Sequence, residues 1–235
     1  DEAHDLFKLP EFINTMMNNN WLGSKSKQGF YKKEINAGKK EIFTLDLDTL
    51  EYRSKKSANF ATLELTKKVD KVIDRFPILV NGKDKAGRFF RKNFAAMFAY
   101  VQNRIPEISD ETYRIDDAMK AGFGWEHGPF QIWDAIGIEK GIQLMKEEGY
   151  EVNPWVNEML SQGNSSFYSI NNGAKYYYDI PSKSQVKVPG QEAFIILENV
   201  RETKTIWRNS GASIQHLGDG VLNVEFQSKM NTLGG

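Results

Sequence analysis

The feature that most constrains the fold of this chain is an internal repeat. The segment PEFINTMM, which begins at Pro10, matches PWVNEML, which begins at Pro154. Further along, QGFYKK matches NGAKYYYD, and the offset between Gly29 and Gly173 equals the offset between the two prolines. Two matches in the same order and at the same offset predict that the chain holds the tail of one helical unit and the whole of a second copy.

Hydrophobic periodicity predicts a mainly α protein, with short β-strands in the C-terminal tail. The strongest helical pattern covers residues 83–104, where Phe90, Phe94 and Phe98 share one apolar face. Further helices are expected over residues 9–20, 57–76 and 153–162, and on both sides of Gly137. From Tyr176 onward, alternating runs separated by Gly, Pro and Asn turns predict strands.

These patterns divide the chain into four parts. We expect the tail of the first helical repeat at residues 1–33, a linker with a helix at 34–82, the second helical repeat at 83–180, and a linker followed by the first strands of a truncated domain at 181–235. The chain begins at Asp1 without a methionine and ends directly after a strand-like run. Both ends are therefore interpreted as cuts through a longer polypeptide.

Composition excludes several classes of function. Lys plus Arg equals Asp plus Glu at 31 each, which argues against a nucleic-acid partner bound through bulk charge. The chain has no cysteine, so disulfides, thiolate catalysis and cysteine-ligated zinc are excluded, and a reducing compartment fits. No apolar run approaches the roughly 18 residues of a membrane span. We expect a cytoplasmic protein without a membrane span and without a metal site.

The stretch AMKAGFGWEHGPFQIWDAIG, residues 118–137, has the glycines of a phosphate loop and the histidine of a catalytic base. Its spacing lacks the G-x-G-x-x-G pattern after a strand and the Lys-Ser/Thr of a P-loop. His127 has no candidate metal ligand or nucleophile nearby in the sequence. We therefore expect a tight corner, where Gly122 ends one helix with Ser109 as its N-cap, and Gly128 and Pro129 start the next.

The segment YRIDDAMKAGFGWEHGPFQIWDAIGIEKG resembles the C-terminal helical domain of the 3-hydroxyacyl-CoA dehydrogenases of fatty-acid β-oxidation. That family shows an Ile-Asp-x-Ala-Met run, a glycine pair, and Gly-Pro-Phe-x-x-x-Asp-x-x-Gly. The matching residues here are Ile115, Asp116, Ala118, Met119, Gly122, Gly124, Gly128, Pro129, Phe130, Asp134 and Gly137. Upstream, GRFFRKNF resembles the family's Gly-Phe-x-x-Asn-Arg helix start, which places Asn93 at the family's asparagine, although Phe94 stands where the family has Arg.

Both ends of the chain carry further resemblances. WLGSKSKQGFYKK resembles the family's closing Gly-x-Lys-x-x-x-Gly-Phe-Tyr segment, and bacterial multifunctional β-oxidation proteins carry such a duplicated helical domain. The tail IWRNSGASIQHLGDGVLNVEFQSKMNTLGG resembles the first strands of a crotonase-fold enoyl-CoA hydratase domain, with Asn231, Thr232 and Leu233 at its Asn-x-Leu. The resemblance implies a dehydrogenase that oxidises 3-hydroxyacyl-CoA to 3-ketoacyl-CoA with NAD and is fused to a hydratase.

In the family, a His–Glu pair in an N-terminal dinucleotide-binding domain removes the hydroxyl proton, and no matching unit exists in this sequence. The resemblance thus implies that NAD is bound by a domain missing from this chain, that the chain binds no cofactor, and that it is inactive alone. It is expected to close the acyl-CoA substrate cleft and to form a homodimer interface, with the remaining domains of the parent polypeptide as partners. The candidate substrate-binding residues are Asn93, Lys229 and Thr232.

Alternatives remain open. Asn93 could serve only to satisfy a helix end, and the second copy could replace dimerisation as a pseudo-partner of the first. Asp134 is expected to be a hydrogen-bonding residue at a helix corner rather than a catalyst. A different class of function, a non-catalytic helical interaction module with no acyl-CoA role, is the rival interpretation of the whole chain.

Overall fold

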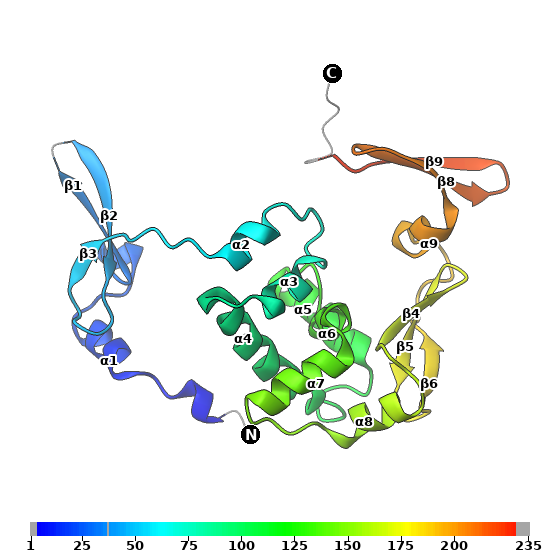
Figure 1. The fold of residues 1–235 in the computed structure, drawn as a ribbon, viewed down its shortest axis with the longest axis horizontal. Helices are drawn as coiled ribbons and strands as arrows, with labels where there is room; N and C mark the ends of the chain where they lie inside the picture. The colour runs from blue at the N-terminus through cyan, green and yellow to red at the C-terminus, as the bar shows by residue number, and fades with distance from the viewer. Residues whose placement is uncertain (1–3, 37, 229–235) are drawn as a thin grey trace. The chain divides into compact units, whose positions relative to one another are not determined.

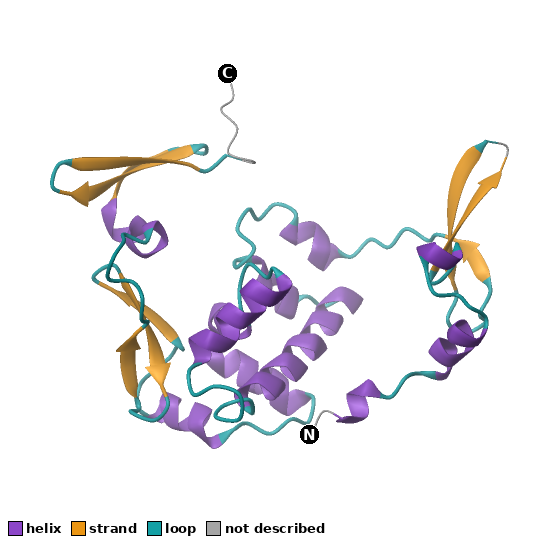
Figure 2. Ribbon diagram, turned by 180° about the vertical axis from the view of Figure 1, so that it is seen from behind, coloured by secondary structure: helices purple, strands orange, loops and turns teal. Residues whose placement is uncertain are grey.

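The computed structural model describes residues 4–36 and 38–228 (Figure 1). Contacts divide the chain into two compact units, Asp1–Phe60 and Ala61–Gly235. Figure 2 shows that both units combine helices with strands. Each unit is described by itself.

The first unit is a short helical segment followed by a three-stranded antiparallel meander. Its elements are η1 (His4–Phe7), α1 (Glu11–Asn18), η2 (Ser24–Ser26), β1 (Tyr31–Asn36), β2 (Lys39–Leu45) and β3 (Tyr52–Ser54). Met16 from α1 and Leu45 from β2 are its buried apolar side chains among the described residues. The Tyr52 hydroxyl donates to the carbonyl of Gly29 at 2.6 Å, and the ring of Tyr52 lies 5.6 Å from that of Trp21. These contacts fix β3 against the turn that precedes β1.

The second unit begins with helices and ends with two small antiparallel sheets. Its helices are α2 (Ala61–Thr66), α3 (Arg75–Asn81), α4 (Lys85–Gln102), α5 (Thr112–Phe123), α6 (Pro129–Ile136), α7 (Ile138–Glu147), α8 (Pro154–Ser161) and α9 (Leu197–Lys204). One sheet has the order β4 (Tyr168–Asn171), β5 (Ala174–Asp179), β6 (Ser184–Lys187), and the other has the order β7 (Thr205–Arg208), β8 (Ala212–Gly218), β9 (Val221–Phe226).

The main core lies among α4, α6, α7, α8 and the residue that precedes β4. Phe98, Phe130, Trp133 and Phe167 are all fully buried there. The rings of Phe98 and Trp133 stack at 4.7 Å, and those of Phe130 and Phe167 meet edge to face at 5.0 Å. The predicted apolar face of the long helix is confirmed, because Phe94 and Phe98 belong to this core and Phe90 packs against it.

The predicted helix corner is confirmed in part. Pro129 is the first residue of α6, a position that suits proline because the N–H it lacks would have no partner within the helix. Gly122, however, lies inside α5, and the left-handed residue that ends this helix is Gly124, with a φ of 67°. The N-cap position of α5 is held by Glu111 rather than Ser109, whose hydroxyl accepts a hydrogen bond from the backbone N–H of Glu111.

The prediction of a mainly α fold with strands confined to the C-terminal tail is wrong. The described residues form nine α-helices and three three-stranded sheets, so the fold is a mixture of helices and antiparallel strands. One sheet, β1–β3, lies largely within residues 34–82, which the sequence predicts to be a linker with a helix. Its strands place lysine beside isoleucine across the ladder, as in Lys33 opposite Ile42 and Ile35 opposite Lys40. Because neither strand alternates apolar and polar residues, the hydrophobic pattern that reveals a half-buried strand is absent.

Replacing Gly141 with alanine is expected to destabilise the fold. A Cβ at this position of α7 would overlap the indole nitrogen of Trp133, whose ring is fully buried and whose N–H donates to the carbonyl of Ile138 at 3.2 Å. Overpacking of this kind costs about 1–3 kcal/mol, which urea denaturation would measure. The matched control is Gly122→Ala, where the new methyl meets no described atom within 4 Å and a gain of about 0.5–1 kcal/mol is expected. Equal effects of the two substitutions would contradict this account.

Candidate functional site

Asp116, on α5, caps the first turn of the next helix, α6. Its carboxylate accepts hydrogen bonds from the backbone N–H groups of Phe130 at 2.8 Å and Gln131 at 3.0 Å. The first amides of a helix have no partner within the helix, so Asp116 supplies from a distance what an N-cap side chain supplies locally. A Cβ on Gly128 would overlap Asp116, which explains the glycine at this position.

Asp134, near the end of α6, binds the backbone of the residues that lead into β4. It accepts hydrogen bonds from the backbone N–H groups of Phe167 at 2.7 Å and Tyr168 at 2.9 Å. The hydroxyl of Tyr168 in turn donates to Asp116 at 2.8 Å. Tyr168 is thus held by both carboxylates, and Asp134 is the hydrogen-bonding residue at a helix corner that its position in the motif indicated.

Burial disturbs the protonation of this cluster. It raises the pKa of Asp116 to about 6 and that of Asp134 to about 7, although the hydrogen bonds that both carboxylates accept act in the opposite direction. Burial also raises the pKa of Tyr168 well above its ordinary value. Lys175, on β5, lies with its Nζ 4.1 Å from the centre of the Tyr168 ring, and burial lowers its pKa. Buried titratable groups with displaced pKa values are a common property of functional sites.

Two polar pockets meet at this cluster. One of about 850 Å³ is lined by residues from several elements, including His127, Gln131, Asp134, Tyr168 and Lys175. A second pocket, of about 240 Å³, is also lined by Tyr168 and Lys175, together with Asp116 and Asp117. Tyr168 and Lys175 therefore border both pockets.

An apolar groove of about 460 Å³ lies on another face of α5. Its walls are Met97 and Val101 from α4, and Ile115, Ala118 and Met119 from α5. Its rim includes Ile108 and Trp125, which are 71% and 38% exposed, and the guanidinium of Arg104, which pairs with Glu107 at 2.8 Å. An open apolar groove between two helices is a surface that an apolar ligand or a partner would cover.

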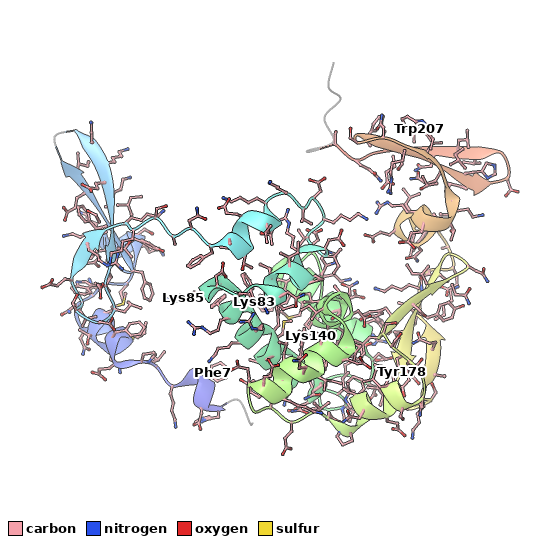
Figure 3. The ribbon with its side chains drawn as sticks, viewed as in Figure 1. Phe7, Lys83, Lys85, Lys140, Tyr178 and Trp207 are labelled. Carbon is pink, nitrogen blue, oxygen red and sulfur yellow. The ribbon has the colours of Figure 1, made fainter. Side chains whose placement is uncertain are left out.

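The candidate substrate residues do not meet in the described structure. Asn93 lies on α4 with an exposed side chain, and its amide nitrogen donates to the carbonyl of Phe89 at 2.9 Å, within the same helix. Lys229 and Thr232, like Asn231, lie outside the described residues. The sequence analysis did not identify Tyr168 or Lys175 as site residues, although the repeat match NGAKYYYD contains Lys175. Figure 3 labels Tyr178, which lies on the same strand as Lys175 and is almost fully buried.

The described residues form neither a dinucleotide-binding turn at the glycine-rich stretch nor a group of three or more metal-ligating side chains. The glycines of GFGWEHG follow the helix α5 rather than a strand, so the strand–turn–helix that cradles a pyrophosphate is not formed there. Across residues 4–36 and 38–228, no group of three or more His, Cys, Asp or Glu side chains is arranged to hold a metal ion. Within the same residues, every helix is too short or too polar to cross a membrane.

The helices that build this cluster match a known protein family. Residues 86–177 match the family model of the C-terminal domain of 3-hydroxyacyl-CoA dehydrogenase, so this segment is related to that domain. The match contains nearly all of α4, the helices α5 to α8, and the four residues Asp116, Asp134, Tyr168 and Lys175. The resemblance that the sequence suggested is confirmed for this part of the chain.

Individual relatives extend the similarity over the whole chain. A protein of Bacillus subtilis named as a probable 3-hydroxyacyl-CoA dehydrogenase is 39% identical over 99% of this chain, which covers 29% of that relative. Two proteins that carry the name of a fatty acid oxidation complex trifunctional enzyme are 22% identical in Rickettsia prowazekii and 24% identical in Rickettsia felis. These alignments cover 99% and 86% of this chain, and 28% and 26% of the relatives. The chain spans less than a third of each of these relatives, and no solved structure matches it.

The raised pKa of the half-buried Asp134 predicts a distinctive pH dependence of stability. The folded protein holds the Asp134 proton more tightly than the unfolded chain, because the pKa rises from 3.8 to about 7 on folding. Its contribution to the free energy of unfolding is therefore complete below pH 4 and is lost as the pH rises to 7, by at most about 1.4 kcal/mol per pH unit. Urea denaturation of the wild type and of Asp134→Asn, from pH 4 to 8, should show the wild-type advantage shrinking over this range. An advantage that stays constant or grows with pH would contradict the prediction.

Proposed function

We propose that this chain is part of a 3-hydroxyacyl-CoA dehydrogenase of fatty-acid β-oxidation, which oxidises 3-hydroxyacyl-CoA to 3-ketoacyl-CoA with NAD. The observation that carries the proposal is the match of residues 86–177 to the helical domain of that family, within a 39% identity that spans the whole chain. The names of the two Rickettsia relatives support a multifunctional parent. We include in the proposal a fused enoyl-CoA hydratase, which follows the second helical repeat.

Within such an enzyme, the helical part is proposed to close the acyl-CoA cleft and to form a subunit interface. The apolar groove between α4 and α5 supports this role, because it offers an apolar chain or a partner helix a continuous wall from Met97 to Met119. Asn93 is proposed to contact the substrate from the exposed face of α4, and Lys229 and Thr232 are proposed to do so from the C-terminal segment. The parent is proposed to act in the cytoplasm.

The catalytic pair and the NAD site are proposed to lie in other domains of the parent polypeptide. The described part of the chain does hold adjacent Glu126 and His127, whose side chains approach to 3.5 Å. The imidazole of His127, however, packs edge to face against the Phe76 ring of α3 at 6.4 Å, and the described residues form no dinucleotide-binding sheet beside it. A base that accepts a substrate proton must face the hydroxyl beside the cofactor, so this pair is a weak candidate. The chain by itself is therefore proposed to be inactive.

Turnover measurements test this proposal. NADH oxidation with acetoacetyl-CoA is expected to be absent with this chain alone and to appear when the dinucleotide-binding domain of the parent is added. Turnover by the pure chain would show that a complete active site lies within it. In the mixture, Asn93→Ala is expected to lower kcat/KM about three- to tenfold, as the loss of one polar contact does. The matched control is Asn171→Ala, at an exposed position at the end of β4, and an equal effect of both would remove Asn93 from the substrate site.

The rival function is a non-catalytic helical interaction module, which the open apolar groove also favours. The melting temperature of the chain, measured with acyl-CoA esters of increasing chain length, separates the two. A substrate role predicts a stabilisation that grows with chain length, because each buried methylene adds about 0.8 kcal/mol to binding and bound ligand stabilises the folded state. An unchanged melting temperature across the series would favour the interaction module.

A further inference from the structure

We propose that Lys175 is a site at which acyl thioesters acylate this protein without a second enzyme. The proposal starts from the position of Lys175 on β5, where its side chain borders the pocket of about 850 Å³ and the pocket of about 240 Å³. An amine that lines two pockets can be reached by the acyl group of a thioester while the rest of the side chain stays half-buried. The choice of thioesters as acyl donors rests on the proposed function, whereas the reactivity of the amine does not.

Lys175 differs from the other lysines near it in what holds its amine. Lys120 pairs with Asp117 at 2.6 Å, and Lys183 and Lys187 pair with Glu158 and Glu192. In the described part of the chain, Lys175 forms no such ion pair. Its Nζ lies instead over the face of the Tyr168 ring at 4.1 Å. The contact orients the ammonium without giving it a carboxylate partner.

Burial and the charges around Lys175 act in opposite directions on its amine, and together they lower its pKa. Burial and the neighbouring cation of Lys120, on α5, lower the pKa of Lys175. Asp116 and Asp117 on α5 and Glu198 on α9 act in the opposite direction and do not restore it. Desolvation is an established way of making a lysine nucleophilic near neutral pH, since only the unprotonated amine attacks a carbonyl.

The reaction is a simple acyl transfer. The lone pair of Nζ attacks the carbonyl carbon of the thioester, a C–N bond forms, and the C–S bond breaks to release the thiolate. The amine loses one proton to solvent and the thiolate takes one up, so the products are an amide on Lys175 and a free thiol. No oxidant or reductant is needed.

Acylation at this position would reach the buried cluster. The amide carries no charge, so the cation over the Tyr168 ring is lost and Asp116 loses a favourable neighbour. Tyr168 is the residue that joins Asp116 to Asp134 through its hydroxyl and its backbone N–H. The modification would therefore act on the contacts that attach β4 and β5 to the helices.

Site-resolved mass spectrometry tests the proposal. The chain is incubated with acetyl-CoA at pH 7.5, its remaining amines are labelled with heavy acetic anhydride, and the light fraction is measured at each lysine. We expect at least about threefold more light acetyl at Lys175 than at the exposed Lys40 and Lys85, since each unit by which a pKa falls gives about ten times more free amine. Acetylation of Lys175 at or below the level of these internal controls would overturn the proposal.

Two variants that shift the local charge in opposite directions sharpen the test. Lys120→Gln removes a cation beside Lys175 and should slow its acetylation, whereas Glu198→Gln removes an anion and should speed it. Lys140→Gln, on α7, is the matched control, with no expected change. The absence of opposite shifts would count against the proposal even if Lys175 reacts.

A second acyl donor distinguishes this proposal from the proposed function. Acetyl phosphate reacts with amines but is not a thioester. Preferential labelling of Lys175 by acetyl phosphate and not by acetyl-CoA would overturn the assignment of thioesters as donors. Because labelling is read without turnover, either proposal can fail while the other stands.

Discussion

The second unit depends above all on the hydrogen bonds that the first backbone N–H groups of α6 donate to the carboxylate of Asp116. This contact fixes the angle between α5 and α6, excludes a side chain at Gly128, and provides the acceptor for the hydroxyl of Tyr168. The glycine-rich stretch around His127 thus has a structural explanation. Gly124 ends a helix and Gly128 allows a close approach to Asp116, and neither role requires a phosphate or a substrate.

The same burial that makes this contact strong also makes it chemically unusual. The aromatic core of Phe130, Trp133 and Phe167 lies directly beside the amides that the two carboxylates accept. Burial there removes part of the solvent from the ionised forms, so the pKa values of both carboxylates rise. Lys175 experiences the opposite effect for the same reason. The hydrogen bonds that join the helices and the displaced pKa values are thus two consequences of the same burial.

The sequence predicted what depends on local pattern and failed where tertiary contacts decide. The long helix with Phe94 and Phe98 was predictable because its apolar face repeats at helical spacing. The sheet β1–β3 was not, because its cross-strand pairs mix lysine with isoleucine and it buries little beyond Leu45. Asp134 was recognisable within a motif, but Tyr168 and Lys175 became significant only when the fold brought them to the two carboxylates. A helix or strand can thus be predicted from the local hydrophobic pattern, whereas a functional site depends on which side chains the folded chain brings together.

The two segments that the sequence predicts to be copies of one repeat show the same distinction. Both predicted copies place a buried methionine on a short helix, Met16 on α1 and Met159 on α8, and both continue into a strand. In the second copy that strand buries Tyr177 and Tyr178, because helices of its own unit lie beside it, whereas Tyr31 in the first copy is 62% exposed. Similar local sequence therefore yields the same elements but different burial.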